Sequence, residues 1–375
     1  MARLSYDLRS IGRNFQISGE FLAAVPHGSG HINDTFAATY RRGGSSVRYI
    51  HQRINQHVFR DPECLMENVL RVTEHIRHKL GGEKEGDARR VLSIVPSRQG
   101  RPWCRDDAGN YWRTYRFIEG ARSHDVIRSR QQAFQVARAF GSFQKQLVDL
   151  PPPRLGETIP DFHNTPKRFE AFRKAVERDA RNRATRASRE IDLIEREAGT
   201  MGPLVRLQQL GQLPERIIHN DTKVNNVLID ETTSEGICVI DLDTVMPGLA
   251  VYDFGDMVRT ATSPAREDAL NLEEVEVRMD IFEALAGGYL SAAGDFLNEN
   301  EKDCLAFSGR LITLELAMRF LTDYLGGDTY FRIHREHQNL DRCRAQLRLF
   351  QELSRKEEQM ERVIGKIRRE GPLPH

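Results

Sequence analysis

The stretch from Ile217 to Asp243 constrains the fold of this chain more than any other. It reads IIHNDTKVNNVLIDETTSEGICVIDLD, with two short apolar, β-branched segments around a polar segment that ends in glycine. This pattern predicts a β-hairpin. Antiparallel pairing brings the start of the first strand beside the end of the second. We therefore expect Asn226 and Asp241 at one end of the hairpin, with Asp221 on the loop before it.

The residue types at this end of the hairpin are those of a phosphoryl-transfer site. Asn226 and Asp241 offer hard oxygen ligands suited to Mg²⁺, and Asp221 can orient and deprotonate an attacking hydroxyl. Lys223 can neutralise charge on the transferred phosphoryl group. Asp243 is a further candidate, either as a metal ligand or as a partner of one. The sequence thus predicts Mg²⁺-dependent phosphoryl transfer.

The length and composition agree with a globular protein of two subdomains. The chain has 375 residues, and 55 Lys+Arg against 54 Asp+Glu give a net charge of +1, which does not point to a nucleic-acid partner. The five cysteines are scattered and form no CxxC pair, which favours a reducing compartment over a disulfide framework or a zinc site. The sequence shows neither the apolar core of a signal peptide nor an apolar run long enough for a membrane span, so we expect a cytoplasmic protein.

A glycine-containing turn near the N-terminus, HGSGHINDT over residues 27–35, lies between two predicted strands at residues 23–26 and 36–40. A strand–turn–strand of this kind can lie over phosphates with its backbone amides, although Gly-Ser-Gly is also a common hairpin connector. The candidate nucleotide contacts in this turn are Gly28, Ser29 and Gly30.

Two charged residues after this turn are candidates for the phosphate-binding ion pair of a kinase. Arg53 ends the next predicted strand, where it is either the cation for the α- and β-phosphates or a solvated edge residue. Glu67 lies on a predicted helix over residues 62–80 and could pair with Arg53. Further on, residues 91–95 and 111–118 are expected to form a hairpin. Phe117 and Ile118 at its end are candidate cofactor contacts at a hinge.

We expect an α+β protein with two lobes. Residues 1–118 form a small antiparallel-sheet lobe that binds nucleotide, and residues 119–375 form a larger, mainly helical lobe for catalysis and substrate binding. The C-terminal helices are predicted at about residues 271–290, 302–325 and 340–369. This arrangement separates a nucleotide site from an acceptor site along the chain.

A second aspartate motif follows the hairpin, Asp253-Phe254-Gly255. It spells the metal motif of protein kinases, but it lies 32 residues past Asp221 and does not follow the second hairpin strand, whereas Asp241 does. We expect Asp253 and Asp256 to begin or cap a helix and to brace the catalytic loop.

The spacing of Asp221, Lys223, Asn226 and Asp241 resembles the catalytic loop and metal aspartate of the protein-kinase-like fold. The full Gly-x-Gly-x-x-Gly and the Ala-Pro-Glu motif of protein kinases are missing, which resembles instead the aminoglycoside and choline kinase branch. Four motifs are similar to the bacterial N-acetylhexosamine 1-kinases, namely Gly30–Thr35, Ile218–Lys223, Val239–Gly248 and Ala317–Leu325. One detail of the match is asparagine at position 220, where most aminoglycoside kinases have glycine.

This resemblance implies an ATP- and Mg²⁺-dependent kinase that phosphorylates the anomeric hydroxyl of N-acetylglucosamine or N-acetylgalactosamine. It implies Asp221 as the base, with Asn226 and Asp241 as metal ligands. The implied sugar contacts are His31, Asp34, Arg319 and Asp323. Arg319 and Asp323 are spaced i,i+4 on a helix, so an ion pair between them is the alternative.

Two other functions stay open. The first is another small-molecule kinase, acting on an aminoglycoside, homoserine or choline. A polycationic substrate favours an acidic C-terminal region, but residues 331–375 hold eleven Lys/Arg against seven Asp/Glu. The second is an inactive nucleotide-binding scaffold, which the presence of the base and both metal ligands argues against.

Overall fold

The computed structural model describes residues 6–28, 32–81 and 87–371. The chain divides into two compact units. Unit 1 comprises Met1–Ala121, Leu155–Ile159 and Ile240–Thr244, and unit 2 comprises Arg122–Arg154, Pro160–Val239 and Val245–His375. The lobe boundary at residues 118 and 119 stays a prediction.

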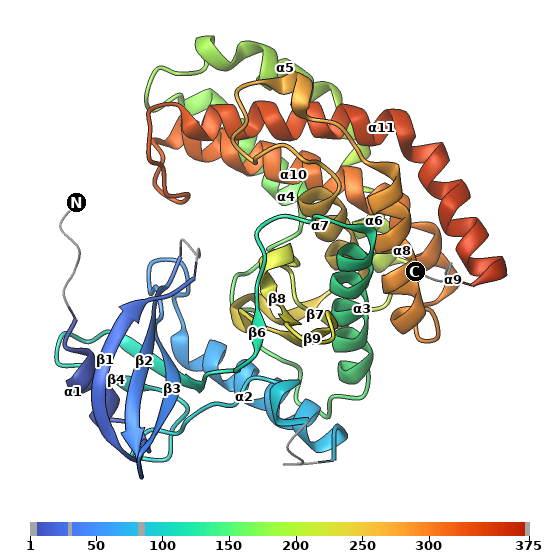
Figure 1. Ribbon diagram of the computed structural model, residues 1–375. Coiled ribbons are helices and arrows are strands. Elements are labelled where there is room, and N and C mark those ends of the chain that lie inside the picture. Colours follow the sequence, from blue (N-terminus) through green and yellow to red (C-terminus); the bar gives the residue numbers. More distant parts are fainter. Residues whose placement is uncertain (1–5, 29–31, 82–86, 372–375) are drawn as a thin grey trace. The chain divides into compact units, whose positions relative to one another are not determined.

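Unit 1 is built on a five-stranded antiparallel sheet in the order β1-β2-β3-β5-β4. Figure 1 shows β1, β2 and β3 side by side. Its strands are β1 (Glu20–Pro26), β2 (Asp34–Arg42), β3 (Ser45–Arg53), β4 (Cys104–Arg105) and β5 (Tyr111–Arg116). The two strands predicted around the glycine turn are thus present. The pairing expected between residues 91–95 and 111–118 is present only in part. Ile94 and Tyr115 form one antiparallel bridge, with backbone hydrogen bonds from Val95 to Thr114 and from Arg116 to Ser93, while the start of β5 pairs with β4.

The two faces of this sheet pack against different elements. One face joins helix α1 (Leu8–Arg13) in an apolar cluster that includes Phe15, Tyr40 and Trp112. The other face meets helix α2 (Pro62–Lys79), where the Sδ of Met66 accepts from Arg113 Nη1 of β5 at 3.7 Å. The predicted helix over residues 62–80 is confirmed, with its apolar stripe buried. Successive side chains along one strand therefore point alternately toward α1 and toward α2.

Unit 2 contains the predicted hairpin. Strands β8 (Val227–Asp230) and β9 (Gly236–Val239) pair antiparallel, with Val227 opposite Val239. A second pair, β7 (Arg216–Ile218) with β10 (Met246–Gly248), flanks the hairpin in sequence. The short strand β6 spans Ala121–Arg122. Because β7 ends at Ile218, the residues His219 to Lys223 form the loop that leads into the hairpin.

Helices make up the rest of unit 2. They are α3 (Arg130–Leu147), α4 (Thr165–Arg178), α5 (Ser188–Arg196), α6 (Pro203–Gln209), α7 (Ala250–Ala261), α8 (Met279–Ala293), α9 (Glu299–Asp303), α10 (Leu305–Gly326) and α11 (Gln338–Glu370). Helix α3 packs on α8, and α10 packs on α11, α7 and α4 (Figure 1). The helix expected from residue 271 starts later, because Leu272–Glu274 is a separate 3₁₀ turn before α8.

The predicted α+β class is confirmed, with the antiparallel sheet in the N-terminal region and helices in the C-terminal region. Across residues 6–28, 32–81 and 87–371, no helix combines the length and the apolar character that a membrane crossing requires.

Candidate active site

The loop after β7 is held by one carboxylate of helix α7. Asp253, in the first turn of that helix, accepts hydrogen bonds from the backbone amides of His219 at 2.9 Å and Asn220 at 2.7 Å. The hydroxyl of Thr222 donates to the carbonyl oxygen of Asp253 at 2.6 Å. The expected bracing by Asp253 is thus present, whereas Asp256 pairs with Arg259 at 2.8 Å.

Asp221, Lys223 and Asn226 converge within unit 2. Lys223 Nζ lies 2.9 Å from the Asp221 carboxylate, and Asn226 Nδ2 donates to the Asp221 carbonyl oxygen at 2.8 Å. The Asp221 side chain is 22% exposed. Burial raises the pKa of Asp221, but the charge and hydrogen bond of Lys223 outweigh it and hold that pKa below the usual carboxyl value. Asp221 is therefore a carboxylate at neutral pH.

Asp243 lies in a buried polar cluster of unit 1. It accepts from Asn33 Nδ2 at 2.7 Å and pairs with Arg113 Nη1 at 2.5 Å. Arg113 also donates to Gln52 Oε1 through Nε at 2.9 Å and Nη2 at 2.7 Å. Burial opposes the charge of Arg113, but Asp243, with a smaller contribution from Asp241, raises its pKa. The cluster thus places the buried cation of Arg113 near the carboxylates of Asp243 and Asp241.

Asp241 follows β9 after one intervening residue. Its φ of 60° lies in the left-handed region, which residues other than glycine rarely adopt. Such a conformation is often found at functional sites, where the surrounding structure holds it.

The structure corrects the predicted pairing of Arg53 with Glu67. Arg53 pairs instead with Asp34, at 2.7 Å from Nη2 to Oδ2. It lies opposite Trp112 in the strand register, on the face that packs against α1, whereas Glu67 is on α2 at the other face. The two side chains are separated by the sheet. The buried cation on the α2 side is Arg113.

Arg113 is not among the site residues predicted from the sequence, although a signal for it exists. Its segment, YWRTYR, places an arginine between aromatic residues in a strand, and five of these six residues are buried. The roles of Asn33 and Gln52 in this cluster could not be predicted from the sequence, because polar residues at strand ends are common.

The predicted nucleotide contacts are only partly described. Gly28 has a left-handed backbone with φ 79°, and the adjacent His27 amide donates to the Thr35 carbonyl oxygen at 2.9 Å. Ser29, Gly30 and His31 lie outside the described residues. Phe117 and Ile118 are half-buried after β5, and the Arg48 guanidinium lies over the Phe117 ring at 3.7 Å from its centroid.

Arg319, on helix α10, is surrounded by aromatic rings from other segments. Its guanidinium carbon is 4.7 Å from the centroid of Phe162, 5.8 Å from Tyr330 and 5.7 Å from Phe331. Tyr330 is 43% exposed. Burial and the neighbouring Arg319 lower the pKa of Arg168, so two cationic side chains approach each other here.

Asp323 does not pair with Arg319 among the described residues. Its carboxylate accepts hydrogen bonds from the amides of Thr329, Tyr330 and Phe331 at 2.8–2.9 Å, and from Asn339 Nδ2 at 3.0 Å. Asp323 therefore fixes the loop that carries the aromatic residues, and the alternative of an intrahelical ion pair is wrong.

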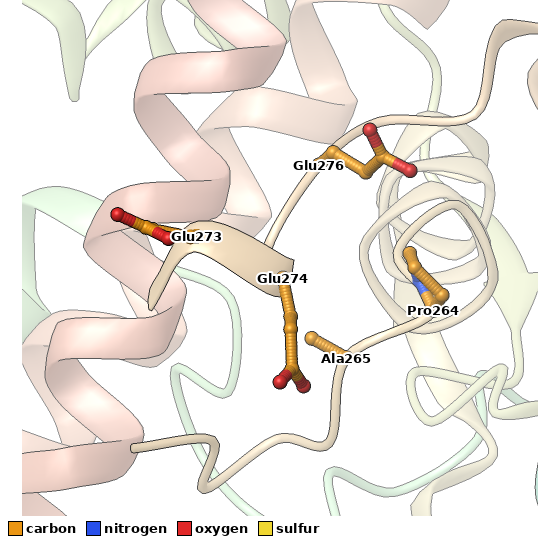
Figure 2. Close-up of a pocket in the computed structure, with 5 residues that line it drawn as sticks. All are labelled: Pro264, Ala265, Glu273, Glu274 and Glu276. Carbon is orange, nitrogen blue, oxygen red and sulfur yellow. The ribbon is translucent and has the colours of Figure 1, made fainter. Parts of the chain in front are cut away.

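A separate depression in unit 2 is acidic (Figure 2). Its lining residues are Pro264, Ala265, Glu273, Glu274 and Glu276. It contains none of the predicted site residues, and its three carboxylates carry no cation among the lining side chains. We do not include it in the candidate site.

Comparison with known proteins finds a matching family and similar folds. The family model described as "Phosphotransferase enzyme family" (APH) matches residues 23–294, more than half of the chain. An aminoglycoside phosphotransferase from Alicyclobacillus acidocaldarius subsp. acidocaldarius DSM 446 is similar in structure, with a TM-score of 0.62, 12% identity, and coverage of 97% of this chain and 98% of that chain.

Two further solved structures have the same fold. The microcompartment-associated aminopropanol kinase has a TM-score of 0.58 and 17% identity, covering 94% of this chain and 98% of that chain. A spectinomycin phosphotransferase in complex with ADP and spectinomycin has a TM-score of 0.54 and 14% identity, covering 94% and 98%. Because the sequence identities are only 12–17%, these similarities establish the fold of the chain and not its substrate.

Proposed function

Because the chain belongs to the phosphotransferase enzyme family, we propose that it is an ATP- and Mg²⁺-dependent kinase that phosphorylates the C1 hydroxyl of N-acetylhexosamines. The observation that carries the kinase assignment is the convergence of Asp221, Lys223 and Asn226 on a loop fixed by Asp253. The crystal complex of a spectinomycin phosphotransferase with ADP supports an adenine nucleotide as the donor.

In this proposal the acceptor oxygen forms a bond to the γ-phosphorus of ATP while the bond from that phosphorus to the β–γ bridging oxygen breaks, so that ADP leaves and Asp221 takes the hydroxyl proton. Its low pKa makes it a weak base, so its main contribution is to hold the hydroxyl in line with the phosphate, and proton transfer comes late. Lys223 keeps Asp221 ionised and adds positive charge near the transferred phosphoryl group. No covalent intermediate with the protein is needed.

The donor set suits Mg²⁺, which would neutralise charge on the β- and γ-phosphates when bound. Among the described residues, the Asn226 side chain bonds only through its amide nitrogen, which leaves its amide oxygen to face a cation. We propose Asn226 and Asp241 as the ligands. Asp243 is engaged by Asn33 and Arg113, so we assign it to supporting the segment that carries Asp241.

The surroundings of Arg319 support a neutral acceptor. Aromatic faces bind ammonium groups in many proteins, but here three rings already surround the protein's own guanidinium. A second cation, Arg168, lies nearby, so a choline, an aminoalcohol or an aminoglycoside would meet like charge. A sugar can accept hydrogen bonds from Arg319 and place its apolar face on Tyr330.

The remaining predicted acceptor contacts divide into two groups. His31 and Asp34 stay proposed sugar contacts; Arg53 and Tyr6 both bind Oδ2 of Asp34, whose side chain is 40% exposed. Asp323 is instead proposed to act on the acceptor indirectly, because backbone amides occupy its carboxylate. Another small-molecule kinase activity remains the alternative, and an inactive scaffold is the less favoured one.

The direct test is ADP release with Mg·ATP and a panel of acceptors, followed by ³¹P NMR of the product. We expect turnover of N-acetylglucosamine or N-acetylgalactosamine to a 1-phosphate. The matched control is the 1-O-methyl glycoside of the same sugar, which lacks the free C1 hydroxyl and should be inert. Equal turnover of the glycoside would contradict C1 phosphorylation, and activity only on choline, aminopropanol, homoserine or kanamycin would contradict the sugar assignment.

A further inference from the structure

Asn220, the residue before Asp221, has a left-handed backbone with a φ of 67°. This conformation costs about 1 kcal/mol for an L residue and persists where neighbouring groups hold it. Its amide is held by Asp253, as described above. Its carbonyl oxygen lies 3.2 Å from Nε2 of His163, a side chain for which the proposed chemistry has no use.

His163 is held in turn by helix α10. Its Nδ1 lies 2.7 Å from Glu315 Oε1, and Glu315 Oε2 accepts from the hydroxyl of Thr165 at 2.7 Å. The side chains of His163 and Glu315 are 3% and 0% exposed. Water therefore does not compete for these bonds, and a buried chain of hydrogen bonds runs from α10 to the carbonyl next to Asp221.

The contact with Asn220 fixes one hydrogen of the imidazole. A carbonyl oxygen only accepts, so Nε2 of His163 must donate. A second hydrogen is shared between Nδ1 and the Glu315 carboxylate, and wherever it resides Nε2–H stays directed at Asn220. The rings of Phe162 and Tyr252, with centroids 4.7 and 5.2 Å away, restrict rotation of the imidazole.

We propose, resting on the kinase function above, that His163 and Glu315 are positioning residues that hold the Asn220 carbonyl and thereby orient Asp221 toward the acceptor. Arg319, the proposed acceptor contact, lies four residues after Glu315, about 6 Å along the same helix. One turn of α10 thus carries both Arg319, which would contact the acceptor, and Glu315, which holds the loop of Asp221 through His163.

The test uses two substitutions that differ by one methylene. In His163→Gln the amide nitrogen reaches the place of Nε2 and can donate to Asn220, whereas in His163→Asn the side chain is too short. We expect His163→Asn to lower kcat about tenfold or more, because small displacements of a catalytic group are costly, and His163→Gln to stay within about threefold of wild type. The KM for ATP should not change in either variant. Equal kcat values for the two variants would overturn the proposal.

A double-mutant cycle tests whether His163 acts through Asp221. If it does, His163→Asn should cause no further loss of kcat in an Asp221→Asn background. A full tenfold loss in that background would assign His163 a role independent of Asp221 and overturn the positioning role.

The assay separates failure of this inference from failure of the proposed function. Wild-type protein is measured first with Mg·ATP and N-acetylglucosamine. If it rejects N-acetylhexosamines but phosphorylates another alcohol of the panel, the sugar assignment fails, and the two His163 variants are compared on that alcohol. A wild-type protein that phosphorylates no alcohol would overturn both proposals.

Discussion

Arg113 Nη1 and Asp243 Oδ1 lie 2.5 Å apart in unit 1, with side chains only 1% and 4% exposed. Gln52 accepts from Nε and Nη2, and Met66 Sδ also accepts from Nη1, so the guanidinium is fixed by three partners. A buried ion pair of this kind contributes little net stability as a pair, but the loss of one partner leaves an uncompensated charge in the interior.

Substitution of Arg113 should therefore lower the free energy of unfolding much more than substitution of Arg53. We expect Arg113→Met to lower the free energy of unfolding by about 3–5 kcal/mol, because Asp243 loses its counterion. The matched control is Arg53→Gln on the neighbouring strand, where Asp34 is 40% exposed and the expected cost is about 0–1 kcal/mol. Urea unfolding measures both, and equal costs would contradict the assignment of Arg113 as the buried cation.

Lys223 should set the acidic limit of activity. Its charge holds the pKa of Asp221 below the usual value, so the base stays ionised as the pH falls through the weakly acidic range. Lys223→Met removes this attraction and leaves burial, which raises the pKa of Asp221, so the acidic limb of the kcat/KM profile should move to higher pH. Lys223→Arg keeps the charge and serves as the control. An unchanged acidic limb in Lys223→Met would argue against Asp221 as the titrating base.

His51 should make unit 1 sensitive to acid. It is fully buried between Tyr40 and Thr114, and burial lowers its pKa from 6.5 to about 4. Between these two values the unfolded chain binds a proton that the folded protein does not, so stability falls as the pH is lowered. The full loss is at most about 3.4 kcal/mol.

The measurement for His51 is urea unfolding at pH 7 and pH 4.5. His51→Gln cannot titrate, so its stability, although lower at neutral pH, should fall less over this range than that of wild type. The same pH dependence in both proteins would show that other groups cause it.

Arg319 should affect the acceptor and not the nucleotide. Loss of a charged hydrogen bond to substrate costs about 1.5–3 kcal/mol, or roughly 10- to 100-fold in kcat/KM for the acceptor, so we expect this for Arg319→Gln with an unchanged KM for ATP. Arg310→Gln on the same helix is the control, since Arg310 pairs with Glu357 at 2.8 Å. A rise in the KM for ATP alone would contradict a role at the acceptor.

Local sequence patterns were sufficient for the hairpin and for the loop of the proposed base. Apolar β-branched segments and a polar turn determine β8 and β9, and Asp221, Lys223 and Asn226 are close enough in sequence that local geometry brings them together. The bracing by Asp253 was also predictable, because an aspartate in the first turn of a helix accepts from backbone amides.

Interactions over long sequence separations were not predictable in this way. The position of Arg53 follows from strand alternation, but which face α2 covers is decided by packing. Because α2 covers the face that carries Arg113, the buried arginine is Arg113, 60 residues after Arg53. Similarly, the spacing of Arg319 and Asp323 is that of an ion pair, yet the loop after α10 supplies three amides that bind the carboxylate.

The two hydrogen bonds that the Asp253 carboxylate accepts from the amides of His219 and Asn220 have a consequence for the time scale of motion. Asp253 is fully buried in the first turn of α7, so we expect the amides of His219 and Asn220 to exchange only through openings that expose this carboxylate to water. In hydrogen–deuterium exchange, these loop amides should be protected as strongly as the buried helix. We therefore expect this connecting segment between strands to open as slowly as the protein core.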